Sequence, residues 1–406
     1  MASMTVSAGN PTGTASTGDA KARIWASIVR LNDWLEKNDY RGYDTFDGLS
    51  AKYLRPLTFE TKLLRTVLQQ GVRRFPLNLR PVLGIPKSRS TKGMGYIAKG
   101  FMRLQDSTGE KSWGDKAESA LQWLIENKSK GKYSGACWGN HFDYQSRSFY
   151  LPNGVPTIVW TSLIGHAFLD GYDHFRNEKY LEVAVSACEH ILHDLARSPE
   201  INGALCISYI PTGLNFIHNA NTLGGSLLAR TYSLTRNEAY LSLAQKAMQY
   251  TANGQRPDAS WYYGEALNAR WVDSFHTAYV LDCFKYYIKA TGDEGFQEKL
   301  TAGYKYWKST FFLPDGTPRY YDYKTLPIDI QCSSQAIDTL VFFYDQDPDS
   351  LALALKVANW TIDNMQDQTG YFYYRRYSNW LVNKTPTLHW GQATMLCSLA
   401  GLHKLL

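Results

Sequence analysis

Phe175-Arg-Asn-Glu-Lys-Tyr180 and Ser233-Leu-Thr-Arg-Asn-Glu-Ala-Tyr240 are two versions of one loop, each of which ends a helix and begins another with an aromatic residue at a similar offset. A third stretch, Ala290-Thr-Gly-Asp-Glu-Gly-Phe296, has the same arrangement. A recurring loop of this kind indicates a repeated two-helix unit. One unit cannot bury its own apolar face, so neighbouring units must pack on one another.

Helical periodicity continues outward from these loops to both ends of the chain, and alternating β-branched runs are nearly absent. Helices that begin near residues 93, 158, 220, 274, 333 and 391 recur at intervals of about 55–65 residues, each followed by one partner helix before the next. The pattern predicts about thirteen helices. Their expected ranges are 20–37, 59–74, 93–105, 113–127, 158–175, 180–196, 220–233, 238–251, 274–290, 294–310, 333–344, 351–365 and 391–405.

Six helix pairs can bury their apolar faces by closing into a ring, with the last helix completed by the first. An open solenoid is the competing architecture, but its terminal repeats should be polar caps. The final helix contains Met395-Leu-Cys-Ser-Leu-Ala-Gly-Leu402, which is apolar. The sequence therefore predicts an all-α protein, an (α/α)6 toroid of about six helix pairs.

The composition fits one large globular unit. No Pro- or Ser-rich linker interrupts the chain, so residues 20–406 are expected to form a single toroid domain and residues 1–19, rich in Ser, Thr, Gly and Ala, a disordered tail. That tail lacks the basic and apolar regions of a signal peptide, and no run is long and apolar enough for a membrane span. We therefore expect a soluble, cytoplasmic protein with its six cysteines reduced and buried.

The net charge of +6 is spread along the chain without a basic block, which disfavours a nucleic-acid partner and remains compatible with an anionic small molecule or acidic glycan. No metal-ligand spacing beyond an isolated Cys137 and His141 is present, and there is no P-loop, GxGxxG or GxSxG motif. The sequence therefore predicts neither a metal nor a cofactor, and it leaves the oligomeric state open.

Unusual residues gather in the long loops that precede the inner helices, whereas the other linkers are short. In a ring of helix pairs the inner helices all point the same way, so these loops lie at one end and predict a site there. Aromatic faces pack on sugar rings, polar side chains bind the hydroxyls, and helix N-termini favour a carboxylate or phosphate. The candidate sugar-binding residues are Trp138, His141, Gln145, Arg147, Asn219, Trp261, Tyr263, Trp271, Tyr321, Lys324, Gln331, Trp390 and Gln392.

Several of these candidates also have a purely structural interpretation. A lone histidine such as His141 is commonly a hydrogen-bonded structural residue, and Trp261 could serve loop-to-helix packing instead of binding sugar.

The candidate catalytic residues are Asp273, Asp143, Asp329 and His276. Asp273 is the preferred general acid because it lies between aromatic residues, although the same position suits a helix N-cap. Asp143 is the preferred partner carboxylate, or else it holds Arg147 in place. Asp329 is held in reserve and also suits capping, and His276 is a proton shuttle if the reaction is epimerisation.

The chain resembles the six-hairpin glycosidase superfamily and, more narrowly, bacterial proteins described as polysaccharide-biosynthesis proteins. The matching stretches are Gly42-Tyr-Asp-Thr-Phe-Asp-Gly48, Asn78-Leu-Arg-Pro-Val-Leu-Gly-Ile85, Trp138–Arg147, Asn219-Ala-Asn-Thr-Leu-Gly-Gly225, Trp261-Tyr-Tyr-Gly264, Asp273-Ser-Phe-His-Thr277 and Trp390-Gly-Gln392. The resemblance covers residues 24–406. It implies an (α/α)6 toroid that acts on uronate-containing or other glycans with paired carboxylates.

Gln255-Arg-Pro-Asp-Ala-Ser-Trp261 and Gln366-Asp-Gln-Thr-Gly-Tyr-Phe372 are similar to the QxxxGxW repeat of terpene cyclases. The DxDD acid motif of those enzymes is absent, so these stretches are interpreted as ties between loop and helix. The favoured function is a glycoside hydrolase-like enzyme that cleaves an acidic glycan by hydrolysis or acts on it by elimination or epimerisation. A non-catalytic glycan-binding component of polysaccharide assembly and a terpene-cyclase-like enzyme are the alternatives.

Overall fold

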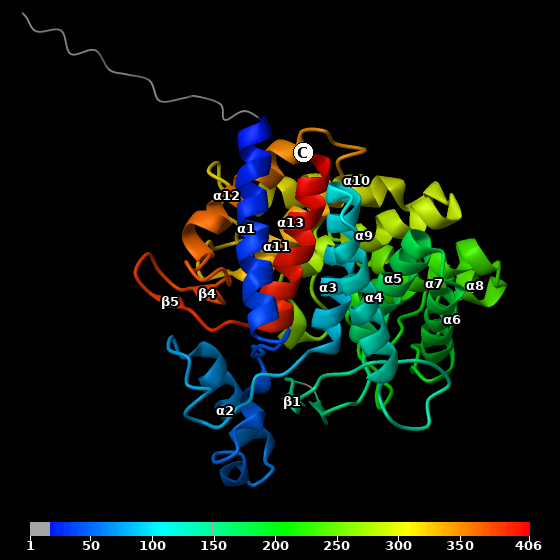
Figure 1. The fold of residues 1–406 in the computed structure, drawn as a ribbon. Helices are drawn as coiled ribbons and strands as arrows, with labels where there is room; N and C mark the ends of the chain where they lie inside the picture. The colour runs from blue at the N-terminus through cyan, green and yellow to red at the C-terminus, as the bar shows by residue number, and fades with distance from the viewer. Residues whose placement is uncertain (1–16, 148) are drawn as a thin grey trace, which may run out of the picture.

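The structure, a computed structural model, describes residues 17–147 and 149–406 and contains thirteen α-helices in these ranges (Figure 1). Each of the helices predicted from the periodicity is present. Residues 1–16 of the expected tail lie outside the described residues. Helix α1 (Thr17–Lys37) begins three residues before the predicted start, so residues 17–19 belong to it.

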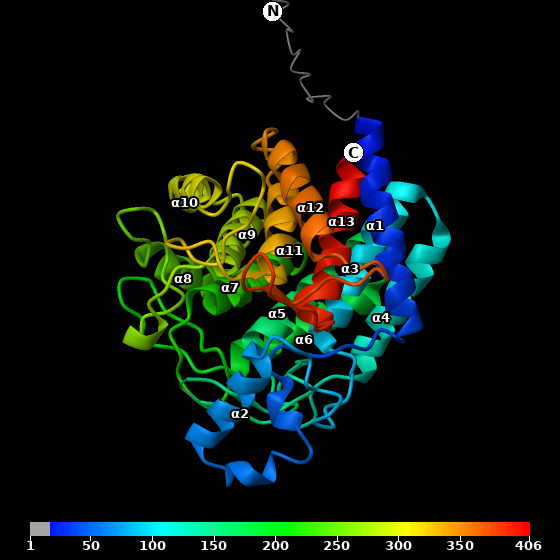
Figure 2. The ribbon, with the colours of Figure 1, turned by 90° about the vertical axis from the view of Figure 1, so that its left-hand side faces the viewer.

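Six inner helices form a closed ring. In chain order they are α3 (Thr91–Thr108), α5 (Ile158–Phe175), α7 (His218–Thr235), α9 (Ser274–Thr291), α11 (Ile330–Phe342) and α13 (Ala393–Leu405). Each packs on the next, and α13 packs on α3, which closes the circle. Figure 2 shows α13 between α1 and α11, with α3 beside it. The protein is therefore an all-α toroid, as the sequence predicted.

The outer layer consists of α4 (Lys111–Glu126), α6 (Glu178–His193), α8 (Glu238–Asn253), α10 (Gln297–Thr310), α12 (Ser350–Met365) and α1. Helix α1 packs on α13 and α12, so the first helix completes the last pair. The apolar last helix thus has a partner on either side.

The recurring loops cap their helices in the same way. Arg176 and Arg236 end α5 and α7 in the left-handed conformation, with φ of 55° and 58°. The next residues, Asn177 and Asn237, accept hydrogen bonds from the first turns of α6 and α8. This shared geometry explains why the same residues recur in the two loops.

Among the described residues the strands form two small antiparallel sheets, and isolated bridges join some of the loops. One pairs β1 (Tyr144–Gln145) with β2 (Tyr150–Leu151), and the other joins β3 (Ile328–Asp329), β4 (Arg375–Arg376) and β5 (Val382–Asn383). The short helices are η1 (Asp47–Ser50), η2 (Pro56–Thr58), η3 (Leu267–Ala269), η4 (Glu294–Phe296) and the π-helical turn η5 (Leu388–Gln392).

Residues 41–85 form a lobe outside the ring, which the sequence analysis did not foresee. Helix α2 (Lys62–Arg74) is its largest element, and Figures 1 and 2 show it projecting beyond the ends of the inner helices. The lobe has a small core of its own, made by Tyr43, Ala51, Val72 and Ile85. Asp47 and Arg80, both buried, form an ion pair of 2.8 Å inside it.

The two cyclase-like stretches tie loops to helices, as interpreted from the sequence. The side chain of Gln255 donates hydrogen bonds to the carbonyls of Ala259 and Lys299, and Gln366 donates to those of Gly370 and Ser27. All six cysteines are buried and unpaired. No helix among the described residues is long and apolar enough to cross a bilayer.

Candidate functional site at the N-terminal ends of the inner helices

Half-buried aromatic side chains surround the end of the ring where the inner helices begin. We call this group the aromatic rim, and its members are Phe46, Tyr144, Tyr209, Tyr263, Trp271, Tyr321 and Trp390. Ring contacts connect most of them, directly or through Phe149, Phe275, His276 and Tyr320. Because each ring is partly exposed, the rim offers apolar faces of the kind that pack on sugars. Tyr263, Trp271, Tyr321 and Trp390 were predicted for this role.

His389 lies below the rim in the π-helical turn η5 that opens α13. Its Nδ1 lies 2.6 Å from a carboxylate oxygen of Asp44, which comes from the lobe, and 3.2 Å from Oγ of Ser90. Its Nε2 is buried and has no hydrogen-bond partner among the described residues. Burial lowers the pKa of His389 below its usual value, and the charge of Asp44 opposes this effect.

Lys92, in the first turn of α3, places its ammonium among four aromatic rings. Its Nζ lies 5.1 Å from the ring centre of Trp160 and 5.4 Å from that of Trp390, with Tyr96 and Tyr279 about as close. Burial lowers the pKa of Lys92 to about 8, and Asp44 is the charge that opposes this. The ammonium has no carboxylate within salt-bridge distance in the described chain, so a buried cation lies here without an ion-pair partner.

Other buried polar atoms at this end of the ring also have no hydrogen-bond partner among the described residues. Among them are Asn140 Oδ1, His141 Nδ1, Trp160 Nε1, Asn219 Oδ1, Gln331 Oε1 and Trp390 Nε1. Buried polar groups without partners are costly and need an explanation, such as a ligand. Asn219, Gln331 and His141 were predicted to bind sugar, and His141 has its pKa lowered by burial to about 4.

Asp273 and His276 form a second carboxylate–imidazole pair. Asp273 is fully buried, caps α9 by accepting from the backbone N–H of His276, and accepts from the indole N–H of Trp271 at 2.8 Å. The same carboxylate lies 2.7 Å from Nδ1 of His276, whose side chain stays one-fifth exposed. Both oxygens of Asp273 are thus occupied, which suits a residue that orients His276 better than a general acid.

The other two carboxylates are held by arginines. Asp329 caps α11 and binds Arg375 at 2.6 Å, with both side chains buried. Asp143 lies 3.3 Å from Arg55 and accepts from the backbone N–H of Asn153. Arg147, the partner that the sequence suggested for Asp143, instead lies over the ring of Trp271 and donates to the carbonyl of Asn268.

Four candidate sugar-binding residues have structural roles instead. Trp138 and Trp261 are core residues whose indole N–H groups donate to the carbonyls of Leu124 and Thr251. Gln145 ties β1 to α2, and Gln392 bonds both the N–H and the carbonyl of Phe372. A fully buried ring has no free face for a sugar, so sequence patterns alone misassign such residues. Lys324 is exposed and lies over the rings of Tyr321 and Tyr323.

Arg73 is a second cation without an acidic partner at this end. It leaves α2 toward the rim, donates to the hydroxyl of Tyr374 at 3.1 Å, and lies 4.4 Å from the ring centre of Phe46. Its positive charge acts on Tyr320, Tyr321 and Tyr144, where it opposes the rise in pKa that burial causes. The lobe therefore contributes both Asp44 and Arg73 to the site.

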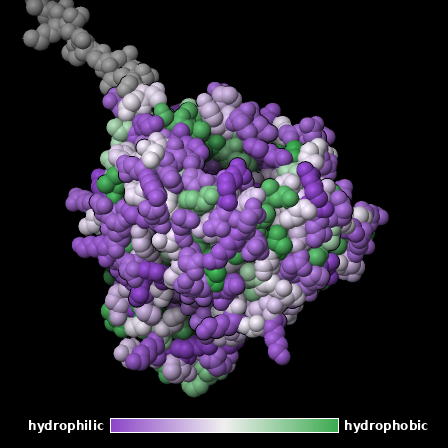
Figure 3. Space-filling model, turned by 45° about the vertical axis from the view of Figure 1, so that its right-hand side comes forward, coloured by the Kyte–Doolittle hydropathy of each residue, from purple (hydrophilic) through white to green (hydrophobic). Residues whose placement is uncertain are grey.

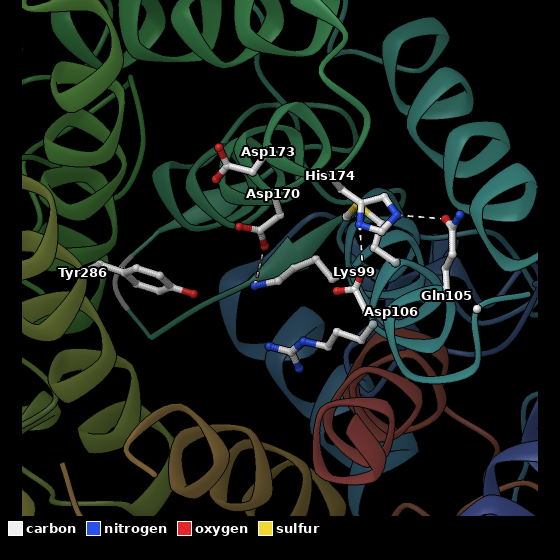
Figure 4. A pocket seen from close by; sticks show the side chains of 10 residues that line it. Lys99, Gln105, Asp106, Asp170, Asp173, His174 and Tyr286 are labelled. Carbon is white, nitrogen blue, oxygen red and sulfur yellow. Dashed lines mark hydrogen bonds and ion pairs between the residues drawn. The ribbon is translucent and has the colours of Figure 1, made fainter. Parts of the chain in front are cut away.

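The opposite end of the ring contains an open cavity of about 750 Å³, lined by residues of α3, α5 and α9 (Figure 4). Lys99 lies 3.2 Å from Asp170, which also binds Arg230 at 2.7 Å. Asp106 pairs with His174 at 3.1 Å and with Lys404 at 2.7 Å. Hydrogen bonds between side chains join α3, α9 and α11 inside the ring. The hydroxyls of Tyr96 and Tyr279 lie 2.8 Å apart, and the side chain of Gln331 donates to the hydroxyl of Tyr279.

Sequence reasoning missed Asp44, His389, Lys92 and Arg73 as site residues. Asp44 lies in the stretch 42–48 that carries the family resemblance, and His389 directly precedes Trp390. Both could therefore have been proposed as site residues from the sequence. Lys92 and Arg73 carry no local signal, since a lysine in a helix is usually solvated. Among residues 17–147 and 149–406, no three His, Cys, Asp or Glu side chains gather to form a metal site.

No family model matches the sequence, and no curated protein matches it either. Solved structures do share the fold. An unsaturated glucuronyl hydrolase specific for heparin has a TM-score of 0.62 at 12% identity, covering 95% of this chain and 96% of its own. A polysaccharide lyase gives 0.60 at 10% identity, with 95% and 98% covered. The cellobiose 2-epimerase from Bacillus thermoamylovorans B4167 gives 0.59 at 12% identity, with 77% and 87% covered. At these identities the likeness shows the fold alone, a toroid of helix pairs.

Proposed function

We propose that the protein is a carbohydrate-active enzyme that binds a saccharide at the aromatic rim and transfers protons there with His389 and His276. The observation that carries this proposal is the Asp44–His389 pair. Asp44 and Ser90 both lie close to Nδ1 of the imidazole, which leaves Nε2, a buried atom without a protein partner, as the nitrogen that could accept a proton from a ligand. A neutral histidine oriented by a carboxylate is a competent general base.

The occupied carboxylates favour proton transfer at carbon over hydrolysis. A glycosidase needs one carboxyl that can donate a proton to the leaving oxygen and a second carboxylate that acts on water or on the sugar. Asp44 and Asp273 are each held by a histidine, and Asp329 by an arginine. Epimerisation and elimination both begin when a base removes a proton from carbon, and structures with this fold include an epimerase and a lyase as well as hydrolases.

The unpaired cations favour an acidic sugar. Lys92 and Arg73 have no carboxylate partner within the described chain, and a uronate would supply one. A carboxylate also makes the hydrogen on the adjacent carbon easier to remove, and a nearby cation stabilises the negative charge that develops there. We propose a uronate-containing oligosaccharide as the substrate, handled in the cytoplasm during polysaccharide biosynthesis, as the sequence resemblance implies.

Incubation with uronate-containing and matched neutral oligosaccharides in deuterated water tests the proposal. Deuterium at carbon without cleavage, followed by NMR, identifies an epimerase, and a new ultraviolet-absorbing double bond identifies a lyase. New reducing ends without either signal would contradict proton transfer at carbon and restore hydrolysis. Saturable binding without any turnover would favour the glycan-binding alternative.

A further inference from the structure

The lobe is a small part of the chain, yet it exposes as many large apolar side chains as the rest of the described molecule together. Half of the exposed large apolar side chains of the described residues lie within positions 53–82, namely Tyr53, Leu57, Phe59, Leu63, Leu64, Val67, Phe75, Leu77 and Val82. Figure 3 shows apolar side chains in green at the foot of the molecule, where the lobe lies. Apolar side chains concentrated in this way mark an interaction surface.

Helix α2 buries Val72 and Gln69 but leaves much of its apolar surface exposed. Gln69 is fully buried and exchanges hydrogen bonds with the backbone of Gln145, whereas Leu63 is 71% exposed and Val67 59%. A helix in a soluble protein ordinarily turns its apolar stripe to the core. In α2 only Val72 and Leu68 do so, and the exposed Leu63 and Val67 need an explanation outside the fold.

The same segment carries the positive charge of the protein. Residues 41–85 contain eight basic residues (Arg41, Lys52, Arg55, Lys62, Arg65, Arg73, Arg74 and Arg80) and three acidic residues (Asp44, Asp47 and Glu60), a balance of +5. This is most of the net charge of +6, so the charge is concentrated in the lobe and not spread along the chain as the sequence analysis stated. Lys52, Lys62 and Arg74 are exposed and make no ion pair among the described residues, so they are available to a negatively charged partner.

We propose that the lobe docks on the surface of an anionic lipid bilayer, with Leu63, Val67 and their apolar neighbours inserted between the lipids. The combination of exposed apolar side chains and unpaired basic residues is the one that interfacial membrane binding uses. The lobe projects from the ring, so it can reach a flat surface that the remainder of the molecule does not touch (Figure 2).

Membrane docking would place the candidate site close to the bilayer. Helix α2 contacts β1, and Arg73 reaches the aromatic rim from the same helix that exposes Leu63. A saccharide carried on a lipid or displayed at the membrane surface would then lie near the rim. This docking is independent of the reaction that the site performs.

Co-sedimentation of the full chain with vesicles tests the docking. The vesicles contain either phosphatidylglycerol and phosphatidylcholine in equal parts or phosphatidylcholine alone. We expect binding to the anionic vesicles, weakened by high salt and nearly absent on the neutral ones. Leu63→Gln with Val67→Gln should lower the affinity by about tenfold or more, because two inserted side chains are lost. Lys62→Gln with Arg74→Gln should lower it by about fivefold for each charge.

The matched control is Ile201→Gln, since Ile201 is 68% exposed but lies outside the lobe. It should bind vesicles like the wild type, and all variants should keep the helical circular dichroism of the wild type because only exposed side chains are changed. Equal vesicle binding by the wild type and the Leu63/Val67 variant would overturn the proposal. So would a dimer in lipid-free solution that this variant dissociates, because the apolar surface would then belong to a second copy of the chain.

Discussion

Two lysines of α3, one toward each end of the ring, differ in whether their charge has a partner. At the C-terminal end of the inner helices each cation has a partner: burial alone would lower the pKa of Lys99, but Asp170 raises it well above its usual value. At the N-terminal end the pKa of Lys92 falls to about 8, and the polar atoms around it lack partners. Paired charges stabilise a fold, whereas unpaired ones are retained at a cost that function explains. The open cavity therefore lies at the end where the charges are paired, and the candidate site lies at the other end.

The largest effect should come from His389→Asn. Asparagine can keep the contact with Asp44 but has no counterpart of Nε2, so turnover should fall by about a hundredfold or more while the protein stays folded. The assay is the deuterium exchange or elimination described above. His193→Asn is the control, because His193 is an exposed histidine that pairs with Glu189 on the outer layer. If the His389 variant and the wild type have equal turnover, the catalytic site does not lie at the N-terminal end of the inner helices.

Substituting the two lysines should change the stability in opposite directions. Lys92→Met removes a buried cation without an ion-pair partner and should raise the free energy of unfolding by about 2 kcal/mol at pH 7. Lys99→Met leaves Asp170 with Arg230 alone and should lower it by about 1 kcal/mol. Urea denaturation measures both. If both variants are less stable than the wild type, the buried charge of Lys92 does not destabilise the fold, and the two lysines do not differ in the way described.

The stability gained in Lys92→Met should also depend on pH. The pKa of Lys92 is depressed in the folded protein, so the unfolded chain binds more protons between pH 8 and the ordinary lysine value of 10.5. The wild type should therefore become more stable relative to the variant as the pH rises through this window. A constant difference from pH 7 to pH 10 would show that Lys92 titrates normally.

The affinity for an acidic sugar should also depend on the protonation of Lys92. Below pH 8 Lys92 is charged, and above it uronate binding should weaken by up to about tenfold per pH unit, while a matched neutral sugar is unaffected. Isothermal titration calorimetry at two pH values distinguishes the cases. If the affinities for the acidic and the neutral sugar fall equally with pH, a group other than Lys92 causes the loss of affinity.

The smallest effect is expected from Lys404→Gln at the cavity end. Lys404 is half-exposed and its ion pair with Asp106 is replaceable by His174, so stability should change by less than about 0.5 kcal/mol and turnover not at all. A clear change in turnover would mean that the cavity of Figure 4 takes part in the reaction.

Local sequence patterns predicted the ring because the forces that define it are local. The periodicity of each helix, the repeated Arg-Asn turns and the apolar last helix all act within one or two turns of chain, and α5 was predicted to the residue. The end of the ring that carries the candidate site followed from the direction of the inner helices. The sequence therefore determined the architecture and the side on which polar and aromatic residues collect.

Only the tertiary structure decided which of those residues have partners. Asp44 and His389 come from opposite ends of the chain and meet only because α13 closes the ring beside the lobe. Trp138 and Trp261 look like sugar platforms in sequence but face the core, and Lys92 looks solvated but is buried among aromatic rings. The physical reason is that burial and charge pairing depend on residues far apart in the chain, whereas helix formation does not.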